Sequence, residues 1–152
     1  MNRSITLLLF VSFIVGLCTA NCSAAQDPTT DKHVAVLIER MVKSGTEQKA
    51  FSDLEALGCR AVPAIVRRMD DRRGLPDPRT SLRNNSPDAF EAVRQYGPQQ
   101  IVDALAAILN QMTGQDFGFI YNGATDDERT KAVQGWRDFL RSSPSGELCK
   151  AG

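Results

Sequence analysis

The stretch from Phe51 to Met69, FSDLEALGCRAVPAIVRRM, decides the fold that the sequence predicts. Its first half places Phe51 and Leu54 on one face of a helix that ends at Gly58. Its second half places Pro63 in the first turn of another helix, where the missing amide hydrogen costs little. Two short helices joined at a glycine predict an antiparallel helix pair.

A second stretch further along the chain repeats this design. Ser86-Pro87 opens a predicted helix on which Phe90, Val93 and Tyr96 are spaced three residues apart. Pro98 then lies in the first turn of an aliphatic helix, 35 residues after the corresponding proline of the first stretch. The chain therefore contains two copies of one helix-pair pattern.

These two copies resemble HEAT-like α-helical repeats, whose period is about 40 residues. The resemblance covers residues 46–112 and is strongest over 57–65, which is similar to the family's helix–turn–helix junction. Residues 113–118 and 136–140 resemble the terminal cap of some secreted bacterial repeat proteins. The resemblance implies antiparallel helix pairs that bind a partner through a concave or loop-bearing surface, without catalysis.

The rest of the chain shows helical spacing and no useful period-two alternation. Further helices are predicted from Thr30 or Asp31 to Gly45, over 101–112, and after Thr125, which opens a capping box with Glu128. A long polar loop is predicted over 71–85, and a loop with three aromatic residues over 113–124. We therefore predict an all-α fold class, either a HEAT-like short solenoid or a compact helical bundle.

Residues 1–25 are predicted to be a signal peptide, and residues 26–152 a single α-helical domain. Arg3 precedes an apolar run of about 13 residues, shorter than the roughly 20 that a spanning helix needs. Small residues follow, as at a cleavage site. An uncleaved membrane anchor and a lipoprotein modified at Cys18 or Cys22 are the alternatives. After cleavage no stable membrane span is expected, and the protein is predicted to be periplasmic or secreted.

The cysteine count helps to place the cleavage site. Cleavage after Ala25 leaves only Cys59 and Cys149, whereas cleavage after Ala20 would also leave Cys22. An even number of cysteines suits an oxidising compartment. We therefore predict a disulfide between Cys59 and Cys149, with two unpaired thiols as the alternative.

The composition is that of a globular protein: 42% of the 152 residues are hydrophobic and 24% are charged. The chain has 18 basic and 18 acidic residues, and removal of residues 1–25 takes away only Arg3. The mature chain is thus close to neutral, whereas nucleic-acid-binding proteins are usually strongly basic. No nucleic-acid partner is expected.

The charges are unevenly distributed, because residues 60–83 hold seven arginines against three acidic residues. Arginine favours bidentate contacts with carboxylates or phosphates, so an acidic protein partner or an anionic envelope polymer is predicted for this stretch. The loop before the last helix supplies aromatic anchors. The predicted partner-binding residues are Arg67, Arg68, Arg72, Arg73, Arg79, Arg83, Phe117, Phe119 and Tyr121. The alternatives are a solvated arginine loop with local ion pairs and aromatic residues that pack under the last helix.

Few residues indicate catalysis or cofactor binding. His33 is the single histidine, which excludes zinc sites built from several histidines. Asp116-Phe117-Gly118 is expected to be a turn, Asp70-Asp71 to form local ion pairs, and Asp126–Glu128 to cap a helix. No catalytic residue, metal site or cofactor is predicted.

The sequence therefore predicts an exported, non-catalytic protein–protein binding module of the bacterial periplasm or envelope. One version is an immunity-type inhibitor of a secreted toxin. The alternatives are an envelope hydrolase that uses paired carboxylates and a structural subunit of an envelope assembly. A homo-oligomer is left open.

Overall fold

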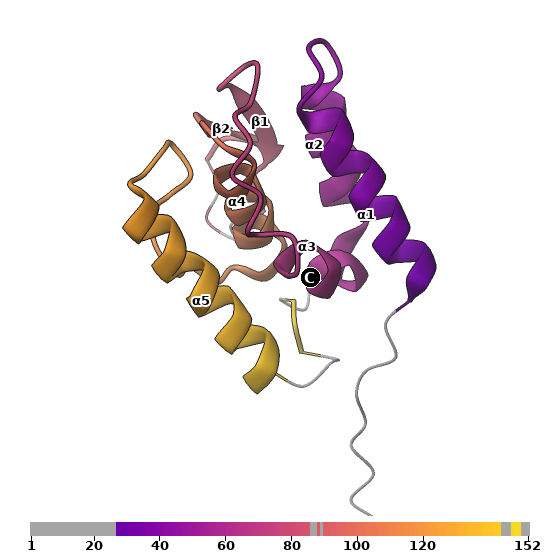
Figure 1. Ribbon diagram of the computed structural model, residues 1–152, viewed down its shortest axis with the longest axis vertical. Coiled ribbons are helices and arrows are strands. Elements are labelled where there is room, and N and C mark those ends of the chain that lie inside the picture. The colour runs from indigo at the N-terminus through magenta and orange to yellow at the C-terminus, as the bar shows by residue number, and fades with distance from the viewer. Residues whose placement is uncertain (1–26, 86–87, 89, 144–146, 150–152) are drawn as a thin grey trace, which may run out of the picture.

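The computed structural model describes residues 27–85, 88, 90–143 and 147–149. Within them the chain forms five α-helices, one short 3-10 helix and two strands (Figure 1). In chain order these elements are α1 (Pro28–Met41), α2 (Glu47–Ala56), η1 (Gly58–Ala61), α3 (Val62–Val66), β1 (Thr80–Arg83), β2 (Val93–Tyr96), α4 (Ile101–Thr113) and α5 (Asp126–Ser142). The predicted signal peptide, with its alternatives, lies outside the described residues.

Helices α1 and α2 lie side by side, joined by a short turn (Figure 1). The Asp27 side chain caps α1 by accepting hydrogen bonds from the amides of Thr29 and Thr30, and Pro28 occupies the first turn. The helix therefore begins before Thr30, where its start was predicted. Gly45 has a φ of 84° in the following turn, a value that favours glycine.

The stretch 51–69 forms a helix on each side of Gly58, as its sequence predicts, but α3 packs on α1, α4 and α5 and does not form an antiparallel pair with α2. Helix α2 is followed by Gly58, whose φ of 63° lets the chain leave the helical direction. Pro63 lies in the first turn of α3, as predicted. Phe51 and Ile65 are fully buried, so both helices contribute to one hydrophobic core.

The all-α prediction is wrong, because β1 and β2 form an antiparallel hairpin. Thr80 pairs with Tyr96, and Arg83 pairs with Val93. Strand β1 lies within the predicted polar loop 71–85, and β2 replaces the helix predicted through Phe90, Val93 and Tyr96. The fold is mixed α/β.

Contacts with distant parts of the chain explain the hairpin. The Ser81 amide donates to Gln48 Oε1 at 2.9 Å, and Gln48 Nε2 donates to the Ser81 carbonyl at 2.8 Å. Leu82 is buried in the core, whereas Phe90 and Val93 are exposed. The three-residue spacing of aromatic and aliphatic residues therefore does not mark a helical face, because tertiary contacts outweigh it here.

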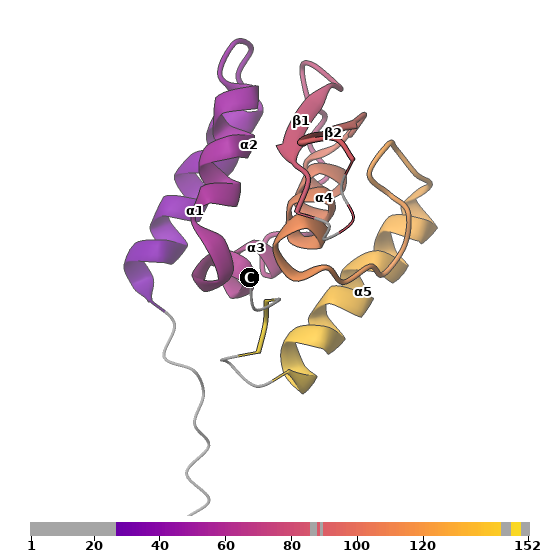
Figure 2. The same cartoon turned by 180° about the vertical axis from the view of Figure 1, so that it is seen from behind.

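Helix α4 forms the centre of the molecule. Every residue from Ile101 to Leu109 is buried, and α4 contacts α2, α3, α5 and β1. Gly114 ends the helix with a φ of 70°, as predicted. Figures 1 and 2 show α1 and α2 on one side of α4 and α5 on the other.

Helix α5 begins at the predicted capping box. The Glu128 amide donates to Thr125 Oγ1 at 3.3 Å, and the Thr125 amide donates to Glu128 Oε2 at 2.8 Å. Near the end of the chain, Cys149 lies at disulfide distance from Cys59 of η1, with sulfur atoms 2.07 Å and Cα atoms 5.7 Å apart. The two cysteines that were predicted to pair therefore lie within bonding distance of each other.

In its first copy the repeated design has the predicted order of helices, whereas a strand stands where the second copy was predicted to begin with a helix. Its second helix, α4, is present. The resemblance to HEAT-like repeats stays a prediction. Among the described residues, no helix combines the length and the apolar character needed to cross a membrane.

Candidate functional site

The arginines at the start of the predicted binding stretch are paired with a carboxylate of α1. Arg67 Nη2 lies 2.6 Å from Asp31 Oδ1, and Arg68 Nη2 lies 2.6 Å from Asp31 Oδ2. Hydrogen bonds from Arg68 and then Arg67 hold the pKa of Asp31 well below its ordinary value. The two arginines therefore fasten α1 to the end of α3.

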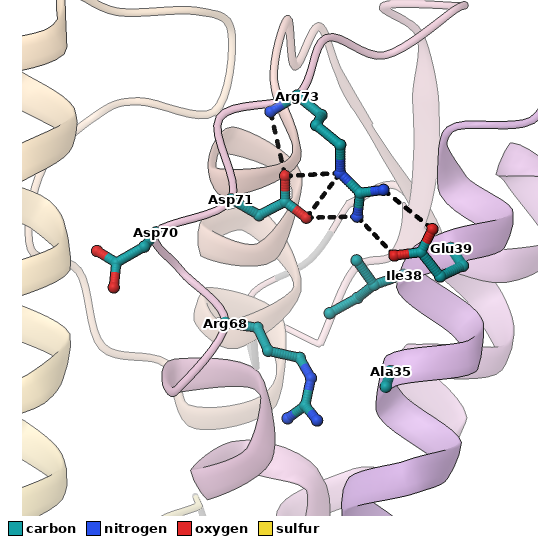
Figure 3. A pocket seen from close by; sticks show the side chains of 7 residues that line it. All are labelled: Ala35, Ile38, Glu39, Arg68, Asp70, Asp71 and Arg73. Atoms are coloured by element: carbon teal, nitrogen blue, oxygen red, sulfur yellow. Dashed lines mark hydrogen bonds and ion pairs between the residues drawn. The ribbon is translucent and has the colours of Figure 1, made fainter.

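Arg73 lies between two carboxylates beside a cavity of about 280 Å³ (Figure 3). Its Nη2 is 2.6 Å from Asp71 Oδ2 and 2.8 Å from Glu39 Oε1. Burial pushes the pKa of Asp71 upward, but hydrogen bonds from Arg73 outweigh it and leave this pKa below its ordinary value. Asp70 points away from Asp71 and pairs with Arg137 of α5. The expected local ion pair is present for Asp71, whereas Asp70 pairs with a residue far along the chain.

The other predicted arginines lie in different surroundings. Arg79 Nε lies 3.0 Å from Asp77 Oδ1, and Arg72 Nη2 lies 3.5 Å from Thr130 Oγ1. Arg83 lies close enough to the Glu55 carboxylate to oppose the rise of its pKa that burial causes. Most of the positive charge in this stretch is therefore matched inside the molecule, and its part in binding an acidic partner stays a prediction.

The three aromatic residues predicted to bind a partner take different positions. Phe117 packs against Trp136 with ring centroids 4.8 Å apart, and a Cβ added to Gly135 would lie 2.6 Å from Phe117. Phe117 thus packs under α5, as the alternative predicted. Tyr121 is 6% exposed, whereas Phe119 is 85% exposed with its ring 5.6 Å from that of Tyr121.

Phe119 and Tyr121 border a second cavity, of about 230 Å³, beside β2. Figures 1 and 2 both place β2 next to the segment that leads into α5. The cavity lies between these two parts of the chain. We call it, with the side chains that line it, the β2 site; its main residues are Arg94, Tyr96, Asn110, Asp116, Phe119 and Tyr121.

Tyr121 lines the β2 site and has a buried hydroxyl. Burial, and next a hydrogen-bonding interaction with the Asp116 carboxylate, raise the pKa of Tyr121. The hydroxyl is therefore directed to Asp116, and the tyrosine contributes its ring to the site.

Arg94 supplies an uncompensated positive charge to the same site. Its side chain is exposed and makes no ion pair or hydrogen bond with the described residues. It lies close enough to Tyr121 to oppose the rise of the tyrosine pKa. Asp116 carries the opposite charge on the other wall, where its Oδ1 accepts a hydrogen bond from the Gly118 amide at 2.8 Å.

The sequence predicted two residues of the β2 site, Phe119 and Tyr121, and missed Arg94, Tyr96 and Asp116 as site residues. Arg94 and Tyr96 were assigned to a helix, and their closeness to the aromatic loop depends on the hairpin. Along β2, Val93, Arg94 and Gln95 are exposed and only Tyr96 is buried, so no period-two alternation marked this strand in the sequence.

The remaining candidates have structural positions. Asp116-Phe117-Gly118 forms the expected turn, and Asp126–Glu128 lies in the first turn of α5. His33 is exposed on α1. In the part of the chain that the structure describes, no three His, Cys, Asp or Glu residues gather as a metal site would require.

Within the described residues, the β2 site combines an exposed aromatic ring, a cavity and an arginine that makes no ion pair. The arginine-rich cavity of Figure 3, in contrast, is lined by charges that already pair with one another. The β2 site is therefore the better candidate for binding. Comparison of the chain with protein-family models, with curated proteins and with solved structures finds no match.

Proposed function

We propose that this protein is a non-catalytic module that binds another protein through the β2 site. The observation that carries the proposal is Phe119, whose ring is 85% exposed and rests on Tyr121 at the cavity. Full burial of such a side chain at an interface is worth about 2–3 kcal/mol. Aromatic residues next to pockets are typical anchors of protein interfaces.

The surroundings of Phe119 support a protein partner. The Arg94 guanidinium makes no ion pair or hydrogen bond with the described residues, and it lines the same cavity as the ring. Protein interfaces commonly combine an apolar anchor with a few such polar groups. The Cys59–Cys149 pair supports the exported version of the proposal, because disulfides persist in oxidising compartments.

Site-specific photocrosslinking tests the proposal. A photoreactive phenylalanine analogue replaces Phe119, and the oxidised protein is irradiated in the envelope fraction of its source. The matched control carries the analogue at Val36, which is exposed on α1, at the other side of the molecule (Figure 1). We expect one protein to be captured from position 119 and not from position 36.

The affinity of the captured protein then separates a specific contact from a chance one. Phe119→Ala should weaken binding about 10-fold to 100-fold, which corresponds to the free energy gained by burying the ring. Val36→Ala should leave the affinity unchanged. Equal affinity of wild-type protein and Phe119→Ala for every captured protein would refute the proposed function.

A further inference from the structure

Strand β2 has one hydrogen-bonding edge that no described part of the chain covers. The Asn84 amide donates to the Ala92 carbonyl at 3.0 Å, which fixes the hydrogen-bonded positions of the antiparallel ladder. Because these positions alternate, Arg94 faces β1 through its backbone. The backbone N–H and C=O groups of Val93 and Gln95 therefore point to the opposite side, away from β1.

The equivalent edge of β1 is closed by side chains of α2. The Ser81 amide donates to Gln48 Oε1 at 2.9 Å, and the Arg83 amide donates to Glu55 Oε2 at 3.4 Å. Side chains thus occupy the outward backbone groups of β1. The outward groups of β2 have no such hydrogen bonds within the described residues.

This free edge adjoins the β2 site. Arg94, Gln95 and Tyr96 line the cavity, and just beyond the strand the Gly97 amide donates to Asn122 Oδ1 at 2.7 Å. The uncovered stretch therefore has a definite end at Gly97. An occupant of this edge would lie directly beside Phe119 and Tyr121.

We propose that the partner adds an extended segment of its own chain to β2 as a third strand. Only a polypeptide backbone presents N–H and C=O groups at the spacing of Val93 and Gln95, and in such strand addition these bonds supply affinity while side-chain pockets supply specificity. This inference rests on the proposed function and specifies how that partner binds.

Charge decides which segment fits. An acidic side chain opposite Arg94 would be favoured, because opposite charges in cross-strand positions attract. A second copy that pairs antiparallel through β2, with Val93 of one copy opposite Gln95 of the other, would place two Arg94 side chains face to face, which disfavours this register. The residue of the added segment that lies beside Tyr121 should be uncharged, because the Asp116 carboxylate lines the cavity next to Tyr121.

Selection from a display library of random peptides about ten residues long, enough to cover one strand, tests the inference. We expect enriched peptides with an acidic residue. In NMR hydrogen exchange with a selected peptide bound, the amides of Val93 and Gln95 should slow at least about tenfold. The Arg94 amide, which already faces β1, should change little. Unchanged exchange at Val93 and Gln95, or a library without binders, would overturn the inference.

Proline at position 95 separates the backbone contribution from that of the side chain. Gln95→Pro removes the outward N–H and leaves the ladder to β1 intact, whereas Gln95→Ala removes only the side chain. The proline variant should bind the selected peptides about tenfold more weakly than the alanine variant. Equal affinities would mean that the edge is not used. Retained exchange protection of the Arg94 amide verifies that the proline variant folds.

Charge reversal provides an independent test. Arg94→Glu should weaken binding of acidic peptides and restore it when their acidic residue is changed to lysine. An unchanged charge preference would overturn the assignment of an acidic segment. If these tests fail while the captured partner still requires Phe119, strand addition is wrong and the proposed function stands. If Phe119→Ala also has no effect on that partner, both are wrong.

Discussion

Asp103 is a fully buried carboxylate whose hydrogen bonds fix the start of α5 on α4. Its side chain is 0% exposed and that of Arg129 is 5% exposed. Arg129 Nε lies 2.7 Å from Asp103 Oδ1 and Arg129 Nη2 lies 2.9 Å from Oδ2, and Oδ2 also accepts from the amides of Gln99 and Gln100 at 3.1 Å. Such complete pairing offsets the cost of removing the charges from water.

Breaking this pair should destabilise the protein strongly. Asp103→Asn leaves the buried Arg129 guanidinium with only the exposed Asp126 carboxylate, 3.5 Å from Nη1, as a counter-charge, so we expect the free energy of unfolding to fall by about 3–5 kcal/mol. Urea unfolding measures the change. The control, Arg141→Met, removes an ion pair with Asp138 at the exposed end of α5 and should have little effect. Similar losses for both variants would show that burial does not determine the strength of these pairs.

At the level of elements, the helices could be predicted because their signals are local. The capping box of Thr125 and Glu128 and the glycines Gly58 and Gly114 lie within a few residues of the ends they define. The β1–β2 hairpin has no comparable signal. Its outer edge depends on Gln48, which lies more than thirty residues before Ser81, and no pattern in the strands themselves reveals that contact.

The same limit applies to the candidate site. Phe119 and Tyr121 could be predicted because aromatic residues in a loop are conspicuous in a sequence. Arg94 and Asp116 are ordinary charged residues, and they become part of a site only when β2 is placed beside the aromatic loop. A contact between segments so far apart depends on the whole core, which short-range spacing does not encode.

The attachment of α1 to the end of α3 should make stability depend on pH. Arg68 and then Arg67 lower the pKa of Asp31 from its ordinary 3.8. A carboxyl with a lowered pKa in the folded state contributes its full stabilisation above the unfolded value and loses it as the pH falls through the folded value. Stability should therefore decline below about pH 4.

Asp31→Asn should make this acid-induced decline shallower, as measured by urea unfolding between about pH 7 and pH 2. Asp53→Asn is the control, since it removes an exposed ion pair with Lys49 that lies within α2 and joins no two elements. We expect its pH profile to follow that of the wild-type protein. If the free energy of unfolding of Asp31→Asn fell with pH as steeply as that of the wild-type protein, the ion pairs of Asp31 would not be the cause of the pH dependence.

For the whole molecule, the pairing of Cys59 with Cys149 joins η1 to the last described segment across 90 residues. Leu148, beside Cys149, is buried in the core, so the bond also holds this segment in place. A cross-link over so long a loop restricts the unfolded chain and is worth about 4 kcal/mol in the chain-entropy model. Much of the protein's stability should therefore depend on its oxidation state.

Cys59→Ser and Cys149→Ser should each lower the free energy of unfolding by about 4 kcal/mol, and the double variant should lose no more than either single one, because both substitutions break the same bond. Urea unfolding of the wild-type protein with a reductant should give the same loss. Non-reducing electrophoresis should show a monomer, since the bond lies within one chain. Additive losses in the double variant, or a midpoint insensitive to reductant, would show that the two thiols do not pair in solution.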